Sequence, residues 1–171
     1  MLQLRREARL TIRPVGPFDL GRLSKLHKAC FDEGWSRADL AHLLSLPGSF
    51  GLVVRLQEAG FAGIEQARGV GFALCRVVRD ESELLSLGVV PEQRRRRIAV
   101  QLLEAGMARC FAGGARVMFL EVAVDNAGAR ALYEAHGFER VGVRADYYLR
   151  ADGNRVDAYT MRCDLDRFVR G

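Results

Sequence analysis

A carboxylate interrupts an otherwise apolar segment of this sequence, and a tyrosine follows it twelve residues later. Glu121 lies within "VMFLEVAV" (117–124), where every neighbour is apolar. An unpartnered carboxylate in a buried strand costs several kcal/mol or has its pKa raised, and such perturbed groups cluster at functional sites. The sequence leaves a structural alternative open, in which the strand end reaches solvent or an arginine pairs with Glu121.

Tyr133 belongs to a short helix that the sequence predicts from Asn126 to His136, terminated by Gly137. Taken alone, Tyr133 is typical of a core aromatic with a solvated hydroxyl, and Asn126 is typical of a helix N-cap. A strand–turn–helix unit would bring this helix back beside the strand that holds Glu121. Only in that arrangement does the Tyr133 hydroxyl gain a chemical role.

Four consecutive arginines, Arg94–Arg97, stand where a helix is predicted to begin, because Ile98, Leu102 and Met107 follow at helical spacing. A helix N-terminus disfavours cations and favours anions. Only two of the 26 basic residues are lysines, so composition alone favours clusters of arginine. Three interpretations are a solvated face, a nucleic-acid patch and an anion site. The anion site alone explains the position, because a bound phosphate reverses the conflict.

The aromatic residues Trp35, Tyr147 and Tyr148 fall in predicted loops or strand ends, where they would line a peptide-binding surface or cover the core. The four cysteines and three histidines are scattered and form no CxxC pair. This spacing indicates neither a metal site nor a disulfide framework, so we expect reduced thiols and a cytoplasmic location.

The elements that must position these residues follow from periodicity and turn signals. The chain has 171 residues, of which 49% are hydrophobic and 27% charged, as expected of a single soluble domain without a membrane span or signal peptide. Its net charge of +5 is weak evidence for nucleic-acid binding. We predict a mixed sheet of the α/β or α+β class. The predicted strands cover 8–14, 50–56, 70–78, 84–90, 116–124, 139–148 and 156–165, and the predicted helices cover 19–31, 36–46, 98–111 and 126–136. Asp19 is a plausible N-cap of the first helix, and Ser36 can cap the second with Asp39 as its capping-box partner.

The segment "ELLSLGVVPEQRRRRIAVQLLEAGMARCFAGGARVMFLEVAVDNAGARALYEAHGF" (83–138) resembles the GNAT acyl-coenzyme A transferases. Within that family, "FLEV", "DN", "ALYE", "GF" and "YY" are similar to the RimI-type ribosomal-protein alanine N-acetyltransferases. The resemblance extends over nearly the whole chain and implies one GNAT domain (1–171), with a central mixed sheet flanked by helices.

The resemblance implies a site for acetyl-CoA as cosubstrate and no metal. Its pyrophosphate loop maps to Arg94–Ala99, with Arg97 in place of the usual central glycine; we expect right-handed helical geometry there. The residues that the resemblance places near the coenzyme are Leu87, Gly88, Val89, Arg94, Arg95, Arg96, Arg97, Ile98, Ala99, Val100 and Asn126. Glu121 matches the family's general base and Tyr133 its general acid, with Glu83 as a reserve base.

The implied activity is acetylation of the N-terminal alanine of the eighteenth protein of the small ribosomal subunit, by a monomer or weak dimer with no nucleic-acid or membrane partner. This function predicts a shallow groove flanked by Trp35 and the hairpin of Tyr147 and Tyr148. Two alternatives stay open. An acetyltransferase for a polyamine or aminoglycoside predicts a closed acidic pocket, and a non-catalytic nucleic-acid module predicts salt-sensitive binding.

Overall fold

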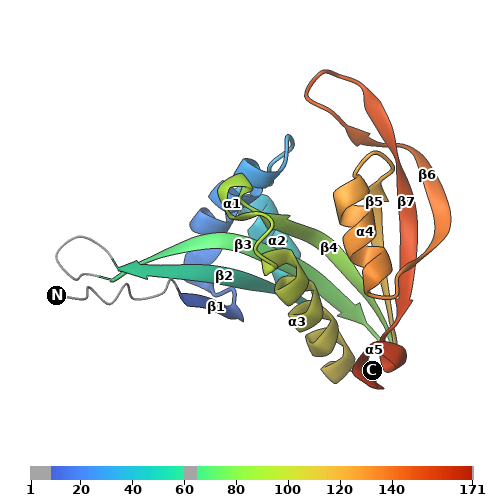
Figure 1. The fold of residues 1–171 in the computed structure, drawn as a ribbon, viewed down its shortest axis with the longest axis horizontal. Helices are drawn as coiled ribbons and strands as arrows, with labels where there is room; N and C mark the ends of the chain where they lie inside the picture. The colour runs from blue at the N-terminus through green and yellow to red at the C-terminus, as the bar shows by residue number, and fades with distance from the viewer. Residues whose placement is uncertain (1–8, 60–64, 171) are drawn as a thin grey trace.

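The computed structural model describes residues 9–59 and 65–170, which form a seven-stranded sheet with helices packed on it (Figure 1). The elements in chain order are β1 (Arg9–Pro14), η1 (Pro17–Asp19), α1 (Leu20–Cys30), α2 (Arg37–Ser45), β2 (Ser49–Ala59), β3 (Glu65–Val78), β4 (Glu81–Val89), η3 (Pro91–Gln93), α3 (Ile98–Ala112), β5 (Val117–Ala123), α4 (Ala127–Ala135), β6 (Glu139–Leu149), β7 (Arg155–Asp164) and α5 (Leu165–Arg170).

The strands are ordered β1-β2-β3-β4-β5-β7-β6, and every neighbouring pair is antiparallel except the parallel pair β4 and β5. This mixed sheet confirms the predicted fold class and the predicted order of strands and main helices. The short helix α5 was not predicted. Strand β4 begins three residues earlier than predicted, because Val78 and Glu81 pair across a tight turn that places Arg79 at φ 58°.

Helices α1 and α3 cover opposite faces of the sheet. Adjacent residues of a strand point to opposite faces. A Cβ atom on Gly71 would lie 3.1 Å from Leu102 of α3, whereas one on Gly88, which pairs with Phe72, would lie 3.1 Å from Cys30 of α1. The core between α3 and the sheet is apolar, with Leu102 and other large side chains fully buried. Each such side chain contributes about 1.5–3 kcal/mol on burial.

The two N-cap predictions have different outcomes. Ser36 caps α2 as predicted, because its hydroxyl accepts a hydrogen bond from the Asp39 N–H while the Asp39 carboxylate accepts one from the Ser36 N–H. Asp19 stands at the N-cap of α1, but its carboxylate makes no cap hydrogen bond there. It accepts instead from the Gly16 N–H at 2.8 Å and from the Arg13 guanidinium. The predicted N-cap position of Asp19 is therefore confirmed, but its side chain bonds to the preceding segment and not to the first turn of α1.

The parallel pair β4 and β5 is joined over only four residues, Glu81–Leu84 with Val117–Leu120. A register shift between Leu74 and Cys75 of β3 lies opposite the end of this ladder. Beyond it, β4 continues beside β3 and β5 continues beside β7, so the two halves of the sheet diverge (Figure 1). The divergence exposes one edge of β4 from Leu85 onward and begins next to Glu121.

Three further observations apply to residues 9–59 and 65–170. No helix there is long and apolar enough to cross a membrane. No group of three or more His, Cys, Asp or Glu side chains gathers where it could hold a metal ion. All four cysteines are free thiols.

Candidate active site

Glu121 is the first residue of β5 beyond its ladder with β4, and its carboxylate has polar partners on β7, the next strand of the sheet, and on β6 beyond it. Thr160 of β7, which faces Glu121 across the sheet, donates its hydroxyl to Glu121 Oε2 at 2.9 Å. The Nε of Arg144, on β6, lies 2.9 Å from Glu121 Oε1. The Glu121 side chain is 11% exposed and that of Arg144 is 60% exposed. The sequence left open whether an arginine pairs with Glu121. The structure shows such a pair, between Arg144 and Glu121, at the point where β4 and β5 diverge.

Tyr147 and Tyr148 lie beside this carboxylate. The Tyr148 hydroxyl donates to the backbone oxygen of Glu121 at 3.0 Å, and the two tyrosine rings meet edge to face at 4.9 Å. Arg144 lies 5.6 Å from the centre of the Tyr147 ring. Burial raises the pKa of Tyr148 to about 12, and burial followed by the nearby Glu121 charge raises the pKa of Tyr147. Both phenols therefore stay protonated at neutral pH.

Trp35 contacts His27 of α1, on the β4 side of the divergence. Its ring stacks on His27 at 4.6 Å, and its backbone N–H donates to His27 Nδ1 at 3.1 Å. His27 Nε2 then carries the ring proton and lies 3.2 Å from the Ser86 hydroxyl of β4. Trp35 and the two tyrosines thus belong to opposite sides of the divergence. No sequence pattern indicated that the buried His27 links α1 to Trp35 and to Ser86 of β4.

Tyr133 is buried on α4, where its ring meets Phe138 edge to face at 5.7 Å. Burial, and secondarily the nearby Tyr148, raises its pKa well above the ordinary value of 10. Because Tyr148 is also bonded to Glu121, it connects the surroundings of Tyr133 and Glu121. Asn126 caps α4, since its side-chain oxygen accepts from the Ala129 N–H at 3.1 Å, as its structural interpretation predicted.

The exposed edge of β4 offers backbone groups to a ligand. Leu87, Gly88 and Val89 pair with β3 on one side only. The Val90 N–H donates to Val70 on β3, so the Val89 N–H, one residue earlier, points to the open edge. Gly88 is required here, because a Cβ atom would lie 2.7 Å from the fully buried Phe72 ring.

The arginine run is a loop that precedes α3. Arg95 and Arg97 both adopt left-handed conformations, with φ of 63° and 59°. The expectation of right-handed geometry at Arg97 is therefore wrong: Arg97 takes the conformation that favours glycine and costs other residues about 1–2 kcal/mol. The tight turn must reverse the chain from η3 into α3, and the position demands this backbone whatever side chain occupies it.

The first turn of α3 has the features of an anion site. The first helical bond runs from the Gln101 N–H to the Arg97 carbonyl, so the N–H groups of Ile98, Ala99 and Val100 precede it and have no partner within the helix. Arg94 donates to the Val89 carbonyl at 3.1 Å, and Arg96 donates to Gln93. Within the described residues, the side chains of Arg95 and Arg97 have no such partner. The free edge of β4, this helix start and the small Gly88 fit an extended pantetheine arm and its pyrophosphate.

Comparison with known proteins gives consistent results. Residues 20–138 match the model of the acetyltransferase (GNAT) family. The chain is 31% identical over 146 residues to the "[Ribosomal protein bS18]-alanine N-acetyltransferase" of Haemophilus influenzae, covering 84% of this chain and 98% of that protein. It is 36% identical over 159 residues to the "N-alpha-acetyltransferase RimI" of Mycobacterium tuberculosis, covering 91% and 92%. The crystal structure of the ribosomal-protein-S18-alanine N-acetyltransferase from Escherichia coli superposes with a TM-score of 0.78 at 27% identity, covering 92% and 94%.

Proposed function

This chain belongs to the acetyltransferase (GNAT) family, and on that premise we propose that it transfers the acetyl group of acetyl-CoA to the N-terminal alanine of ribosomal protein bS18. The family is acetyl-CoA dependent, which excludes the alternative of a non-catalytic nucleic-acid module. The cytoplasmic location and the monomeric or weakly dimeric state remain predictions. The observation that carries the proposal is the carboxylate of Glu121, held at the divergence of β4 and β5 beside two tyrosines.

The residues that would hold acetyl-CoA are those at the open edge of β4 and the start of α3. The N–H of Val89 faces the position of an extended amide chain, and Ile98–Val100 present their N–H groups to phosphate. When bound, acetyl-CoA supplies an acetyl thioester to the incoming amine. Another backbone N–H of β4 near Val89 would donate to the oxygen on which negative charge develops. The left-handed backbone at Arg97 turns the loop as glycine would.

Glu121 acts as the general base. The α-amino group of a protein has a pKa of about 8, so at neutral pH much of it is ammonium and cannot attack. Glu121 accepts a proton from it, directly or through a water molecule, while Thr160 fixes one carboxylate oxygen. Arg144 occupies the other oxygen in the free enzyme. The arriving ammonium group therefore takes the place of the Arg144 guanidinium on the Glu121 carboxylate. Glu121 has a cationic partner both before and after the substrate binds.

Tyr133 acts as the general acid. Its raised pKa keeps the phenol protonated, so that it has a proton to donate to the departing thiolate, and the phenolate then takes up the second proton that the attacking nitrogen loses. Tyr148, bonded to Glu121 and close to Tyr133, orients both sides of the site without changing its own charge. Glu83, the reserve base, lies on β4 opposite Phe119 and is a less direct choice, because it sits inside the four-residue ladder.

A peptide substrate suits this site better than a polyamine. The Glu121 carboxylate is already paired with the exposed Arg144, so it does not offer the free negative charge that a polycation requires. Offering a short peptide that begins with alanine beside spermidine, and recording coenzyme A release, separates the two substrates. Faster release with spermidine would overturn the peptide assignment.

The residue roles are tested by Glu121→Gln and Tyr133→Phe. Each variant is expected to lose about 10²- to 10⁴-fold in turnover while binding acetyl-CoA as the unchanged enzyme does, because each removes one proton-transfer step. Wild-type rates in both variants would show that the roles are misassigned. The described side-chain contacts of Glu121 involve none of the residues proposed to hold acetyl-CoA. Unchanged acetyl-CoA binding in a variant would therefore show that the variant is folded.

A further inference from the structure

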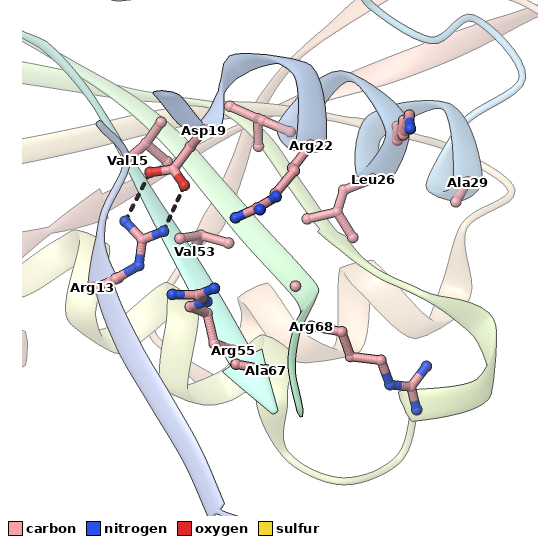
Figure 2. Close-up of a pocket in the computed structure, with 13 residues that line it drawn as sticks. Arg13, Val15, Asp19, Arg22, Leu26, Ala29, Val53, Arg55, Ala67 and Arg68 are labelled. Carbon is pink, nitrogen blue, oxygen red and sulfur yellow. Dashed lines mark hydrogen bonds and ion pairs between the residues drawn. The ribbon is translucent and has the colours of Figure 1, made fainter. Parts of the chain in front are cut away.

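A hollow separate from the proposed acetyl-CoA site lies on the face of the sheet that α1 covers. It has a volume of about 370 Å³ and is formed by α1 and by β1, β2 and β3 (Figure 2). No residue proposed for acetyl transfer lines it. Its volume is within the range of small-molecule sites in proteins.

The walls of this hollow carry most of the net charge of the chain. Its basic lining residues are Arg13, Arg22, Lys25, Arg55 and Arg68, and its only acidic lining residue is Asp19. These six side chains sum to +4, against +5 for the whole chain. Asp19 is fully occupied, because both its oxygens accept from Arg13, whose guanidinium lowers the Asp19 pKa to about 2. The charge of Arg55 also lowers the Asp19 pKa, but the hydrogen bonds of that carboxylate are made with Arg13 and the Gly16 N–H.

Two guanidinium groups point into the open space from opposite walls. Figure 2 shows Arg22 of α1 and Arg55 of β2 extending towards the middle of the hollow. Within residues 9–59 and 65–170, neither these two side chains nor that of Lys25 has a hydrogen-bond or ion-pair partner. Arg55 is half-buried, and the one acidic residue of the lining, Asp19, is already hydrogen-bonded to Arg13, so the Arg55 charge is poorly compensated. An anion between the two guanidinium groups would relieve this conflict.

The floor of the hollow is apolar. Leu26 and Val53 are buried there beneath the arginines, and Ala29 continues the same surface along α1. A ligand that satisfies the whole hollow therefore has a multiply charged head and an apolar or aromatic body. Guanidinium groups match phosphate with paired hydrogen bonds, so the best-fitting class is an organic phosphate of mononucleotide size.

We infer that the hollow between α1 and β1–β3 is a second ligand site, separate from the acetyl-CoA site, that binds a small organic polyphosphate through Arg22, Lys25 and Arg55. This inference does not depend on the acceptor substrate of the enzyme. It requires only that the site stay open when coenzyme A is bound.

Calorimetric titration of the full chain with ATP tests the inference, in the presence of one molar equivalent of coenzyme A, which saturates the tighter site at α3 without filling the hollow. Coenzyme A blocks the phosphate site at α3, so the remaining binding reports the hollow. We expect one molecule of ATP to bind per chain. Arg22→Gln and Arg55→Gln are each expected to weaken that binding about tenfold, because each removes charge-assisted hydrogen bonds. Pyrophosphate, which lacks the apolar body, should bind several-fold more weakly than ATP.

Arg37→Gln is the matched control, because Arg37 is an exposed arginine of α2 outside the hollow. It is expected to bind ATP as the unchanged chain does. Turnover with acetyl-CoA and peptide should be the same in all three variants. Loss of all ATP binding in the presence of one molar equivalent of coenzyme A would overturn the inference, and so would undiminished binding in the Arg22→Gln, Arg55→Gln double variant.

Discussion

Replacing Arg144 with glutamine is expected to lower the KM for an alanine-first peptide and to leave kcat nearly unchanged. In the free enzyme the Arg144 side chain is 60% exposed and its Nε lies 2.9 Å from Glu121. An exposed ion pair of this kind stabilises by about 0.2–1 kcal/mol, because water screens it. The substrate must displace it, so its removal should lower KM by about 1.4- to 5-fold.

The assay is the initial rate of coenzyme A release at saturating acetyl-CoA, over a range of peptide concentrations. Arg140→Gln is the matched control. Arg140 lies on the same strand, but its guanidinium lies 4.6 Å from the centre of the Tyr159 ring and not on Glu121. Both variants remove one positive charge, so a general electrostatic effect on the peptide would change KM in both. Displacement of the ion pair changes KM only in Arg144→Gln.

Two results would refute this reasoning. An unchanged or higher KM in Arg144→Gln would mean that the substrate does not replace the arginine on Glu121. A fall in kcat of more than about tenfold would mean that Arg144 positions Glu121 during the reaction. Arg144→Lys keeps the charge, so its KM should return towards the wild-type value.

Three further predictions concern stability. Arg97→Gly should unfold with a free energy about 1 kcal/mol higher than Arg97→Ala in urea titrations, since the two variants differ by a methyl group at a left-handed position; equal stability would contradict the assigned backbone. Burial lowers the pKa of His27 from 6.5 to about 4, so as the pH falls the unfolded chain is protonated at His27 before the folded chain is. The contribution of the neutral, buried His27 to the free energy of unfolding is therefore complete above pH 6.5 and is lost as the pH falls towards 4. Between pH 7.5 and 5.5 that loss is about 1.3 kcal/mol, and a His27→Asn chain with the same pH dependence would show that another group is responsible. Gly88→Ala should cost about 1–3 kcal/mol in thermal unfolding, because the added methyl meets Phe72, whereas Gly128→Ala, with nothing within 4 Å, should cost nothing.

The sequence predicted the order of the elements because apolar periodicity and turn residues mark each one locally. The capping box at Ser36 and the N-cap at Asn126 were also predictable, since both depend on residues within one turn of each other. Asp19 shows the limit of such reasoning. Its carboxylate is taken by Arg13 of β1, and that contact depends on how the chain folds back over six residues.

The backbone at Arg97 could not be predicted from residue type. Left-handed geometry is a signal only where glycine or asparagine occupies the position, and here an arginine hides it. The family pattern contained the information, because the usual glycine at this point marks a turn that the loop requires. Where another residue replaces a glycine of a family pattern, as Arg97 does here, the turn is therefore expected to be preserved and the new residue to be strained.

The partner of Glu121 depends on a register that no local pattern contains. Between Arg140 and Gly142 one extra residue of β6 bulges out, so that Gly142 pairs with Thr160 and Arg144 with Ala158. This places Arg144 on the same face as Thr160, and hence as Glu121. Without the bulge every later side chain of β6 would turn to the opposite face, and Arg144 would point away. The cation on the proposed catalytic carboxylate is thus set by a single inserted residue twenty positions further along the chain, in a strand that is exposed along most of its length.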